Sequence, residues 1–176
     1  MERKGLIQIY TGDGKGKTTS AIGLIVRALA YNFKVCYIYF HKEPKIWEYG
    51  EHKILKILGV DIFGFAKTHP HFFKNISKEE IRKECLEGLN FIKKIFQENK
   101  YDMIILDEIL ISLRDGFLEE REILELLDSK PKNLELVLTG RGATDVLIEK
   151  ADLVSEIKKI KHPYDKKIKR REGIEY

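Results

Sequence analysis

Short apolar runs alternate along the chain with longer stretches in which apolar residues recur at helical spacing. The runs are rich in β-branched and aromatic residues, which favour strands, and lie at 6–10, 35–40, 60–65, 103–106, 134–139 and 153–157. Helical spacing is found near 18–31 and 46–58, after residue 77, and near 119–127 and 143–150. Strands that alternate with helices usually pair in parallel. The pattern therefore predicts an α/β fold with a mostly parallel, doubly wound sheet and helices on both faces.

Two of these segments are more specific. The run 35–40 is apolar at nearly every position, as expected of a strand that is buried on both faces. The longest helix is predicted to begin after Ser77, because Ser77 and Glu80 have the spacing of a capping box. Its buried stripe at helical spacing is predicted to consist of Ile81, Cys85, Leu89, Ile92 and Phe96.

Composition limits the class of protein. With 176 residues, 43% hydrophobic and 34% charged, and with no linker or repeat, the chain is expected to form a single domain over 1–176. No apolar run approaches the roughly 18 residues of a membrane span. No signal-peptide apolar region follows the N-terminus, so a cytoplasmic location and no membrane partner are expected. Cys36 and Cys85 lack zinc-site spacing and are expected to be buried, reduced thiols.

The first predicted strand ends in a turn rich in glycine and lysine, which opens the first predicted helix. In a strand–turn–helix unit, backbone N–H groups and the helix N-terminus converge on an anion. Glycines allow positive φ and close approach of phosphate, a lysine reaches the outer phosphates, and a threonine hydroxyl binds Mg²⁺. The turn is therefore predicted to bind ATP with Mg²⁺ through Gly12, Asp13, Gly14, Lys15, Gly16, Lys17, Thr18 and Thr19.

The turn departs from the common Gly-x-x-x-x-Gly-Lys-Thr pattern at one position. Counting back from Gly16, the first glycine of that pattern would stand at position 11, where the chain has Thr11, and Gly12 comes one residue late. This departure indicates that the phosphates lie differently from those in common NTPases. The alternative is a tight turn that binds no ligand.

Two further segments end predicted strands at the same edge of the sheet. Asp107 and Glu108 follow four apolar residues and are expected to face the turn and hold Mg²⁺ directly or through water. In the segment 139–142, the glycines free the backbone and Arg141 is placed to contact phosphate or ribose. The alternatives are charged residues that only start a helix, and a turn that is only structural.

These motifs together resemble the P-loop class of ATP:cob(I)alamin adenosyltransferases, enzymes of cobalamin biosynthesis that adenosylate corrinoids. The resemblance rests on YTGDGKGKTT at 10–19, LDE at 106–108 and TGRG at 139–142. It extends to ADLVSEI at 151–157, KHPYD at 161–165 and GIEY at 173–176, all in family order. The shortened loop is itself typical of this family.

The resemblance implies a RecA-like P-loop fold, usually as a homodimer, and transfer of the 5′-deoxyadenosyl group of ATP to a reduced corrinoid. In this family Co(I), made by an electron donor, attacks C5′ of the ribose and expels triphosphate. The resemblance also implies that the nucleotide lies reversed along the loop relative to ordinary ATPases, which would account for the departure at Thr11. Lys17 and Glu108 are the expected catalytic residues, and Lys15 adds charge. Mg²⁺ is expected on Thr18 and Glu108, with Asp107 behind or beside it. Orientation and charge neutralisation would then provide the catalysis.

The corrin side is assigned through the resemblance alone. Family members carry aromatic residues before the long helix that contact the corrin, and here Phe72 and Phe73 are the equivalents, with no tryptophan in this segment. His69 and His71 are either cobalt ligands or ordinary residues of a solvated loop.

Other function classes remain open. The stretch 158–171 has eight Lys or Arg residues, but Pro163, Tyr164 and Asp165 interrupt it and no recognition motif accompanies it. A solvated or triphosphate-facing surface is therefore favoured over nucleic-acid binding. An ordinary NTPase or small-molecule kinase, and an ATP-regulated corrinoid carrier without catalysis, are the remaining alternatives.

Overall fold

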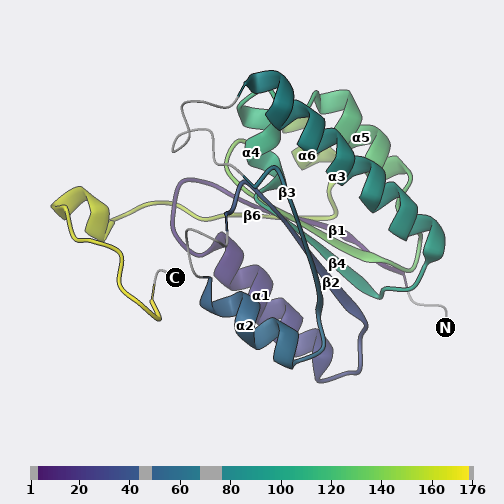
Figure 1. Ribbon diagram of the computed structural model, residues 1–176, viewed down its shortest axis with the longest axis horizontal. Coiled ribbons are helices and arrows are strands. Elements are labelled where there is room, and N and C mark those ends of the chain that lie inside the picture. Colours follow the sequence, from purple (N-terminus) through teal and green to yellow (C-terminus); the bar gives the residue numbers. More distant parts are fainter. Residues whose placement is uncertain (1–3, 44–48, 68–76, 175–176) are drawn as a thin grey trace.

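Six parallel strands form one sheet in the computed structural model, which describes residues 4–43, 49–67 and 77–174. The strand order is β3-β2-β4-β5-β1-β6 (Figure 1). Every pairing among these strands is parallel, so the sheet is more regular than the mostly parallel one predicted. The strands are β1 Ile7–Thr11, β2 Val35–Phe40, β3 Asp61–Phe65, β4 Met103–Asp107, β5 Glu135–Thr139 and β6 Leu153–Glu156.

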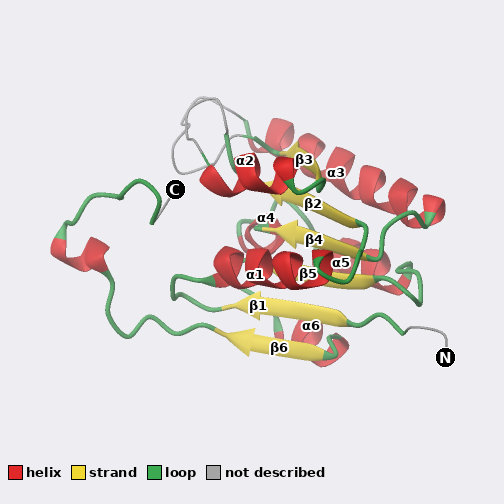
Figure 2. Ribbon diagram, turned by 90° about the horizontal axis from the view of Figure 1, so that it is seen from below, coloured by secondary structure: helices red, strands yellow, loops and turns green. Residues whose placement is uncertain are grey.

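Helices cover both faces of the sheet, as predicted (Figures 1 and 2). One face carries α1 (Lys17–Leu29) and α2 (Gly50–Ile57). The opposite face carries α3 (Lys78–Glu98), α4 (Ile109–Arg114), α5 (Glu120–Asp128) and α6 (Asp145–Lys150). None of the described helices is long and apolar enough to cross a bilayer.

The core is divided between the two faces because successive strand side chains point to opposite sides. Ile38, Ile104 and Leu106 pack with the buried residues of α3, α4 and α5. Tyr37 and Ile105, one position away in each strand, pack with α1 and α2 instead. A strand buried on both faces needs apolar residues at nearly every position, and this explains the continuous apolar runs in the sequence.

The observed helix boundaries can be compared with those predicted from the sequence. Ser77 accepts a hydrogen bond from the Glu80 N–H and the Glu80 side chain accepts from Ser77, so the predicted capping box of α3 is confirmed. Of the helix predicted near 46–58, Gly50–Ile57 is helical and 44–48 lie outside the described residues. The helix α4 was missed because it follows β4 almost directly and is apolar at four of its six positions, so no helical spacing distinguishes it from the strand.

Both cysteines lie in the core, as expected. Burial raises the pKa of Cys36 to about 12 and that of Cys85 to about 11. The two thiols therefore remain protonated at neutral pH and pack as small apolar groups.

The strand order brings the predicted motifs together. The strand β5 lies between β1 and β4, and the carboxyl ends of all three reach the same edge of the sheet. Thr11, Thr139 and Asp107 end these strands. Ligands of open parallel sheets bind at this edge, so the functional site is expected there.

A cluster of aromatic rings packs beneath α2, close to this edge. The ring of His52 stacks on Tyr39 with centroids 4.7 Å apart and meets the edge of Tyr37 at 5.5 Å. Burial and then the nearby Lys42 ammonium lower the pKa of His52 to about 4. His52 is therefore a neutral ring in the folded protein at physiological pH.

The depressed pKa of His52 predicts a loss of stability in acid. Unfolded His52 titrates near its ordinary pKa of about 6.5, so between about pH 6.5 and pH 4 the unfolded chain binds more protons. The free energy of unfolding should therefore fall over this window by up to about 3 kcal/mol more in the native protein than in His52→Phe. Urea unfolding at several pH values measures the difference. Equal acid sensitivity of the two proteins would contradict the assignment.

Substitution of alanine for glycine is expected to have opposite effects on stability at two helical positions, Gly88 and Gly23. A Cβ at Gly88 in α3 would lie 2.7 Å from the Phe40 ring and 3.1 Å from that of Phe65, whereas a Cβ at Gly23 in α1 would meet nothing within 4 Å. Gly23→Ala should stabilise the protein by roughly 0.5–1 kcal/mol through helix propensity. Gly88→Ala should destabilise it by about 1–2 kcal/mol through overpacking. Denaturant unfolding measures both, and shifts in the same direction would contradict the packing described.

Candidate functional site

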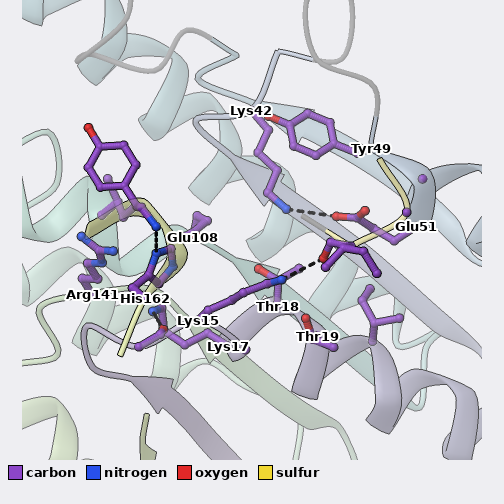
Figure 3. Close-up of a pocket in the computed structure, with 18 of the residues that line it drawn as sticks. Lys15, Lys17, Thr18, Thr19, Lys42, Tyr49, Glu51, Glu108, Arg141 and His162 are labelled. Carbon is purple, nitrogen blue, oxygen red and sulfur yellow. Dashed lines mark hydrogen bonds and ion pairs between the residues drawn. The ribbon is translucent and has the colours of Figure 1, made fainter. Parts of the chain in front are cut away.

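A cleft of about 1020 Å³ opens at the carboxyl edge of the sheet (Figure 3). It lies over the glycine-rich turn and the start of α1, and the first residues of α2 and the segment after β6 also line it. Of the predicted site residues, those that line it are Gly14, Lys15, Gly16, Lys17, Thr18, Thr19, Glu108 and Arg141. The cleft thus collects most of the predicted site in one place.

The turn presents the N-terminus of α1 to the cleft. Gly16 precedes the helix with φ 127°, in the region that favours glycine, and Lys17 is the first helical residue. Lys17, Thr18 and Thr19 form the first turn of α1 and line the cleft. The N–H groups of a first helical turn have no partner within the helix, so they suit an anion.

Gly12 and Gly14 have a second purpose that the sequence did not indicate. Of these two glycines, Gly12 has positive φ, at 95°, and Gly14 does not, so the turn uses the positive φ that glycine permits at Gly12 and Gly16 alone. The Gly14 N–H donates to the Ile157 carbonyl at 2.7 Å, and a Cβ at Gly14 would lie 2.7 Å from that oxygen. These glycines therefore allow the segment after β6 to pack directly on the turn.

The departure at Thr11 has the same origin. Thr11 is the last residue of β1, pairs with Glu156 of β6, and accepts a hydrogen bond from the Ile157 N–H at 2.8 Å. Its hydroxyl also accepts from the Ala143 N–H at 3.4 Å. Position 11 is thus part of the sheet, and the loop proper begins one residue later than in the common pattern.

Two lysines of the turn point in different directions. The buried Lys17 Nζ donates to the carbonyls of Gly12 and Gly14 at 2.7 and 2.8 Å, folding back over its own loop. Burial lowers the pKa of Lys17, and the Glu108 carboxylate opposes that shift. Lys15 Nζ donates to the Ile174 carbonyl at 2.8 Å. Lys15 therefore joins the C-terminal segment to the turn.

Arg141 and Asp13 stand at the mouth of the cleft. The Arg141 guanidinium lies 3.4 Å from the Asp13 carbonyl and 3.9 Å from its carboxylate. Both side chains are more than half exposed, so this pair adds little stability. An exposed arginine beside the turn remains available to an anionic ligand.

Asp107 is completely buried, and both of its oxygens are satisfied. One oxygen accepts hydrogen bonds from the hydroxyls of Thr18 at 2.9 Å and Thr139 at 2.7 Å. The other accepts from Tyr37 at 2.6 Å and lies 2.6 Å from the Lys42 ammonium. Burial alone would raise the pKa of Asp107, but the Lys42 charge and these hydrogen bonds outweigh it and lower the pKa. Asp107 is therefore an ionised residue that holds others in place.

Glu108 differs from Asp107 in its backbone conformation and in its hydrogen bonds. Its backbone is left-handed, with φ 63°, and its N–H donates to Thr139 Oγ1 at 3.0 Å. This conformation costs about 1–2 kcal/mol in a residue other than glycine. Glu108 lines the cleft, and its buried Oε2 has no hydrogen-bond partner among the described residues. Burial and then the Asp107 charge raise its pKa. An orphaned carboxylate oxygen of this kind suits a cation.

Thr18 and Glu108 together are a donor set for a hard divalent cation. The Thr18 hydroxyl donates a hydrogen bond to Asp107, so its oxygen lone pairs remain available to a metal. No group of three His, Cys, Asp or Glu residues in the described parts of the chain forms a metal cage. A cation held by few protein oxygens, with phosphate and water completing its shell, is the usual arrangement for Mg²⁺.

Several residues of the cleft, and Tyr37 buried behind it, were not identified from the sequence. Tyr37 is a polar hydroxyl within a buried strand, and Lys42 lies just past the end of β2 at the same edge. Both residues could have been noticed in the sequence, because each places a polar group in or just after an apolar strand. The other lining residues that were not identified are Ile22, Tyr49, Gly50, Glu51, Ile54, Ile111 and Arg114. His162, Tyr164, Gly173 and Ile174 also line the cleft; they belong to the family motifs at 161–165 and 173–176 but were not predicted as site residues. The predicted corrin residues Phe72 and Phe73, with His69 and His71, lie outside the described residues.

Comparison with known proteins agrees with this geometry. Residues 3–176 match the family model described as ATP:corrinoid adenosyltransferase BtuR/CobO/CobP. A corrinoid adenosyltransferase of Escherichia coli K12 is 32% identical over 176 residues, covering all of this chain and 88% of the relative. Those of Salmonella typhimurium and a Sinorhizobium species are 31% and 33% identical, covering 88% and 82% of the relatives and 100% and 99% of this chain.

A solved structure supports the fold. The KaiC-like protein PH0186 from Pyrococcus horikoshii superposes with a TM-score of 0.56 at 17% identity, covering 87% of this chain and 73% of that one. The likeness confirms the predicted RecA-like α/β architecture and, at this identity, the architecture alone. Because the family model spans nearly the whole chain and the relatives align over their greater part, the chain belongs to the ATP:corrinoid adenosyltransferase family.

Proposed function

We propose that this corrinoid adenosyltransferase binds MgATP in the cleft and transfers the 5′-deoxyadenosyl group to the Co(I) of a reduced corrinoid, with triphosphate as the leaving group. The observation that carries the proposal is the charge of the cleft. Among its described lining residues, five are Lys or Arg and two are Glu. A cationic cleft beside a helix N-terminus suits a leaving group that departs with all three phosphates.

The loop residues are proposed to bind the triphosphate. The Lys17 ammonium already bonds two loop carbonyls, and phosphate oxygens are stronger acceptors that would replace them. Lys15 and Arg141 stand at the edge of the same cleft and add positive charge. The Gly14 N–H is occupied by Ile157, so the phosphates have fewer loop donors than in a common NTPase.

The transfer itself needs no protein nucleophile. The electron pair of Co(I) forms the bond to C5′ of the ribose, the C5′–O bond breaks, and its electron pair leaves with triphosphate. No proton is transferred, so the protein contributes orientation and neutralisation of the charge that develops on the leaving oxygens. Lys17 is proposed as the catalytic cation, and Glu108 as the catalytic carboxylate that positions the metal.

Thr18 and Glu108 are proposed to hold Mg²⁺, with Asp107 behind them. The orphaned Glu108 oxygen and the lone pairs of Thr18 fit this ion, whereas the oxygens of Asp107 are already satisfied. When bound, Mg²⁺ would neutralise charge on the phosphate oxygens.

The remaining parts of the proposal rest on the sequence. A single domain over 1–176 and a cytoplasmic location are proposed from its composition. A homodimer, corrin contacts from Phe72 and Phe73, and an electron donor that reduces the corrinoid to Co(I) are proposed from the family resemblance. Nucleic acid and membranes are not proposed as partners. Co(I) is readily oxidised or protonated, so a site that excludes water is part of the proposal.

Product analysis distinguishes the candidate activities. The protein is incubated without oxygen with MgATP and a chemically reduced corrinoid. Adenosyl transfer predicts triphosphate and a light-sensitive cobalt–carbon species in equal amounts. An NTPase or kinase would instead release ADP, and a carrier would bind both ligands and release neither product. Either of the last two results would overturn the proposal.

Two lysine variants test the loop assignment in this assay, one at the site and one as its matched control. Lys17→Ala should fall below roughly a tenth of the native activity, because it removes the buried cation of the loop. Lys94→Ala removes an exposed lysine of α3, a helix that does not line the cleft, and should retain activity. Circular dichroism checks that both variants fold. Turnover above that level in a folded Lys17→Ala protein would show that the loop assignment is wrong.

A further inference from the structure

Lys42 is a buried lysine whose position the turn motif does not explain. It lies two residues past the end of β2, and only 8% of its surface is exposed. It nevertheless lines the cleft, on the side of α2 (Figure 3). A buried ammonium is costly unless it is paired, so the partners of Lys42 indicate its role.

The partners of Lys42 are two buried residues, Asp107 and Tyr37, and two that line the cleft, Tyr49 and Glu51. Its Nζ lies 2.6 Å from the Asp107 carboxylate, donates to Tyr37 Oη at 3.2 Å, and lies 3.6 Å from Glu51. It also lies 5.0 Å from the ring centroid of Tyr49. An ammonium has three N–H donors, and these four partners surround the ammonium of Lys42. Lys42 is therefore directed at these residues and not at a ligand.

Lys42 is connected to the turn through a single carboxylate. The Asp107 oxygen that Lys42 does not face accepts hydrogen bonds from Thr18 and Thr139. Without Lys42, a fully buried carboxylate would have no counter-ion and would be expected to turn toward another cation or solvent. Thr18 would then lose the acceptor that fixes the direction of its hydroxyl.

We propose that Lys42 is a positioning residue for nucleotide binding, which acts through Asp107 to hold the Thr18 hydroxyl in the orientation that receives MgATP. This inference rests on the proposed function of Thr18. Lys42 itself contacts neither the phosphates nor the metal in this scheme. Its charge balances Asp107, so that Glu108 remains the carboxylate that faces the cleft.

A double-mutant cycle tests whether Lys42 acts through Thr18. The affinity for MgATP is measured by calorimetry, without corrinoid, for the native protein, Lys42→Met, Thr18→Ala and the double variant. Each single substitution should weaken binding about tenfold, and the double variant should bind no more than a few-fold more weakly than the weaker single variant. The effects are expected to be non-additive because both substitutions break the same chain of contacts.

Controls separate this role from a structural one. Lys56→Met, which removes an exposed lysine from the same part of the fold, should leave the affinity unchanged. Thermal unfolding identifies variants that do not fold; if Lys42→Met is one of these, Lys42→Gln replaces it in the cycle. Independent effects, in which the fold-losses of the two single variants multiply, would overturn the inference, as would an unchanged affinity in either single variant. Because the cycle is read from nucleotide affinity alone, its failure is distinct from a failure to form adenosylated product.

Discussion

The buried carboxylate of Asp107 is the interaction on which the site depends. Its oxygens join β2 through Tyr37, β5 through Thr139 and the start of α1 through Thr18, with Lys42 as the counter-ion. A fully buried charge is tolerated only when it is paired and hydrogen-bonded, so these elements must keep their relative positions for the carboxylate to remain satisfied. The same contacts leave Glu108 as the carboxylate that faces the cleft.

A second constraint acts on the turn from the opposite side. The backbone of Ile157 bonds both Thr11 and Gly14, and Lys15 bonds the Ile174 carbonyl, so the segment after β6 is attached to the loop at both ends. This attachment explains why glycine is needed at position 14 without a positive φ. It also separates the loop from that of common NTPases, which fits a site proposed to bind a triphosphate that leaves intact.

Local sequence pattern predicted most helices and strands and the motif residues. It did not predict contacts between residues that are far apart in the sequence. The turn, the apolar strands, the α3 cap and Glu108 follow from spacing and residue type within a few positions. Lys42 and Asp107 meet across 65 positions, so no local pattern relates them. The contact of Ile157 with Gly14 is likewise tertiary. The helix α4 follows β4 almost directly and is apolar at four of its six positions, so its sequence shows no spacing that separates a helix from the strand.

The central claim is that ATP breaks at the ribose carbon and not between phosphates. ATP that carries a heavy oxygen isotope in the bridge between C5′ and the α-phosphorus tests it directly. After anaerobic reaction with reduced corrinoid, mass spectrometry should find the isotope in triphosphate and none in the adenosylated product. Isotope retained in ADP or AMP would contradict the account, because the bond at C5′ would then have remained intact.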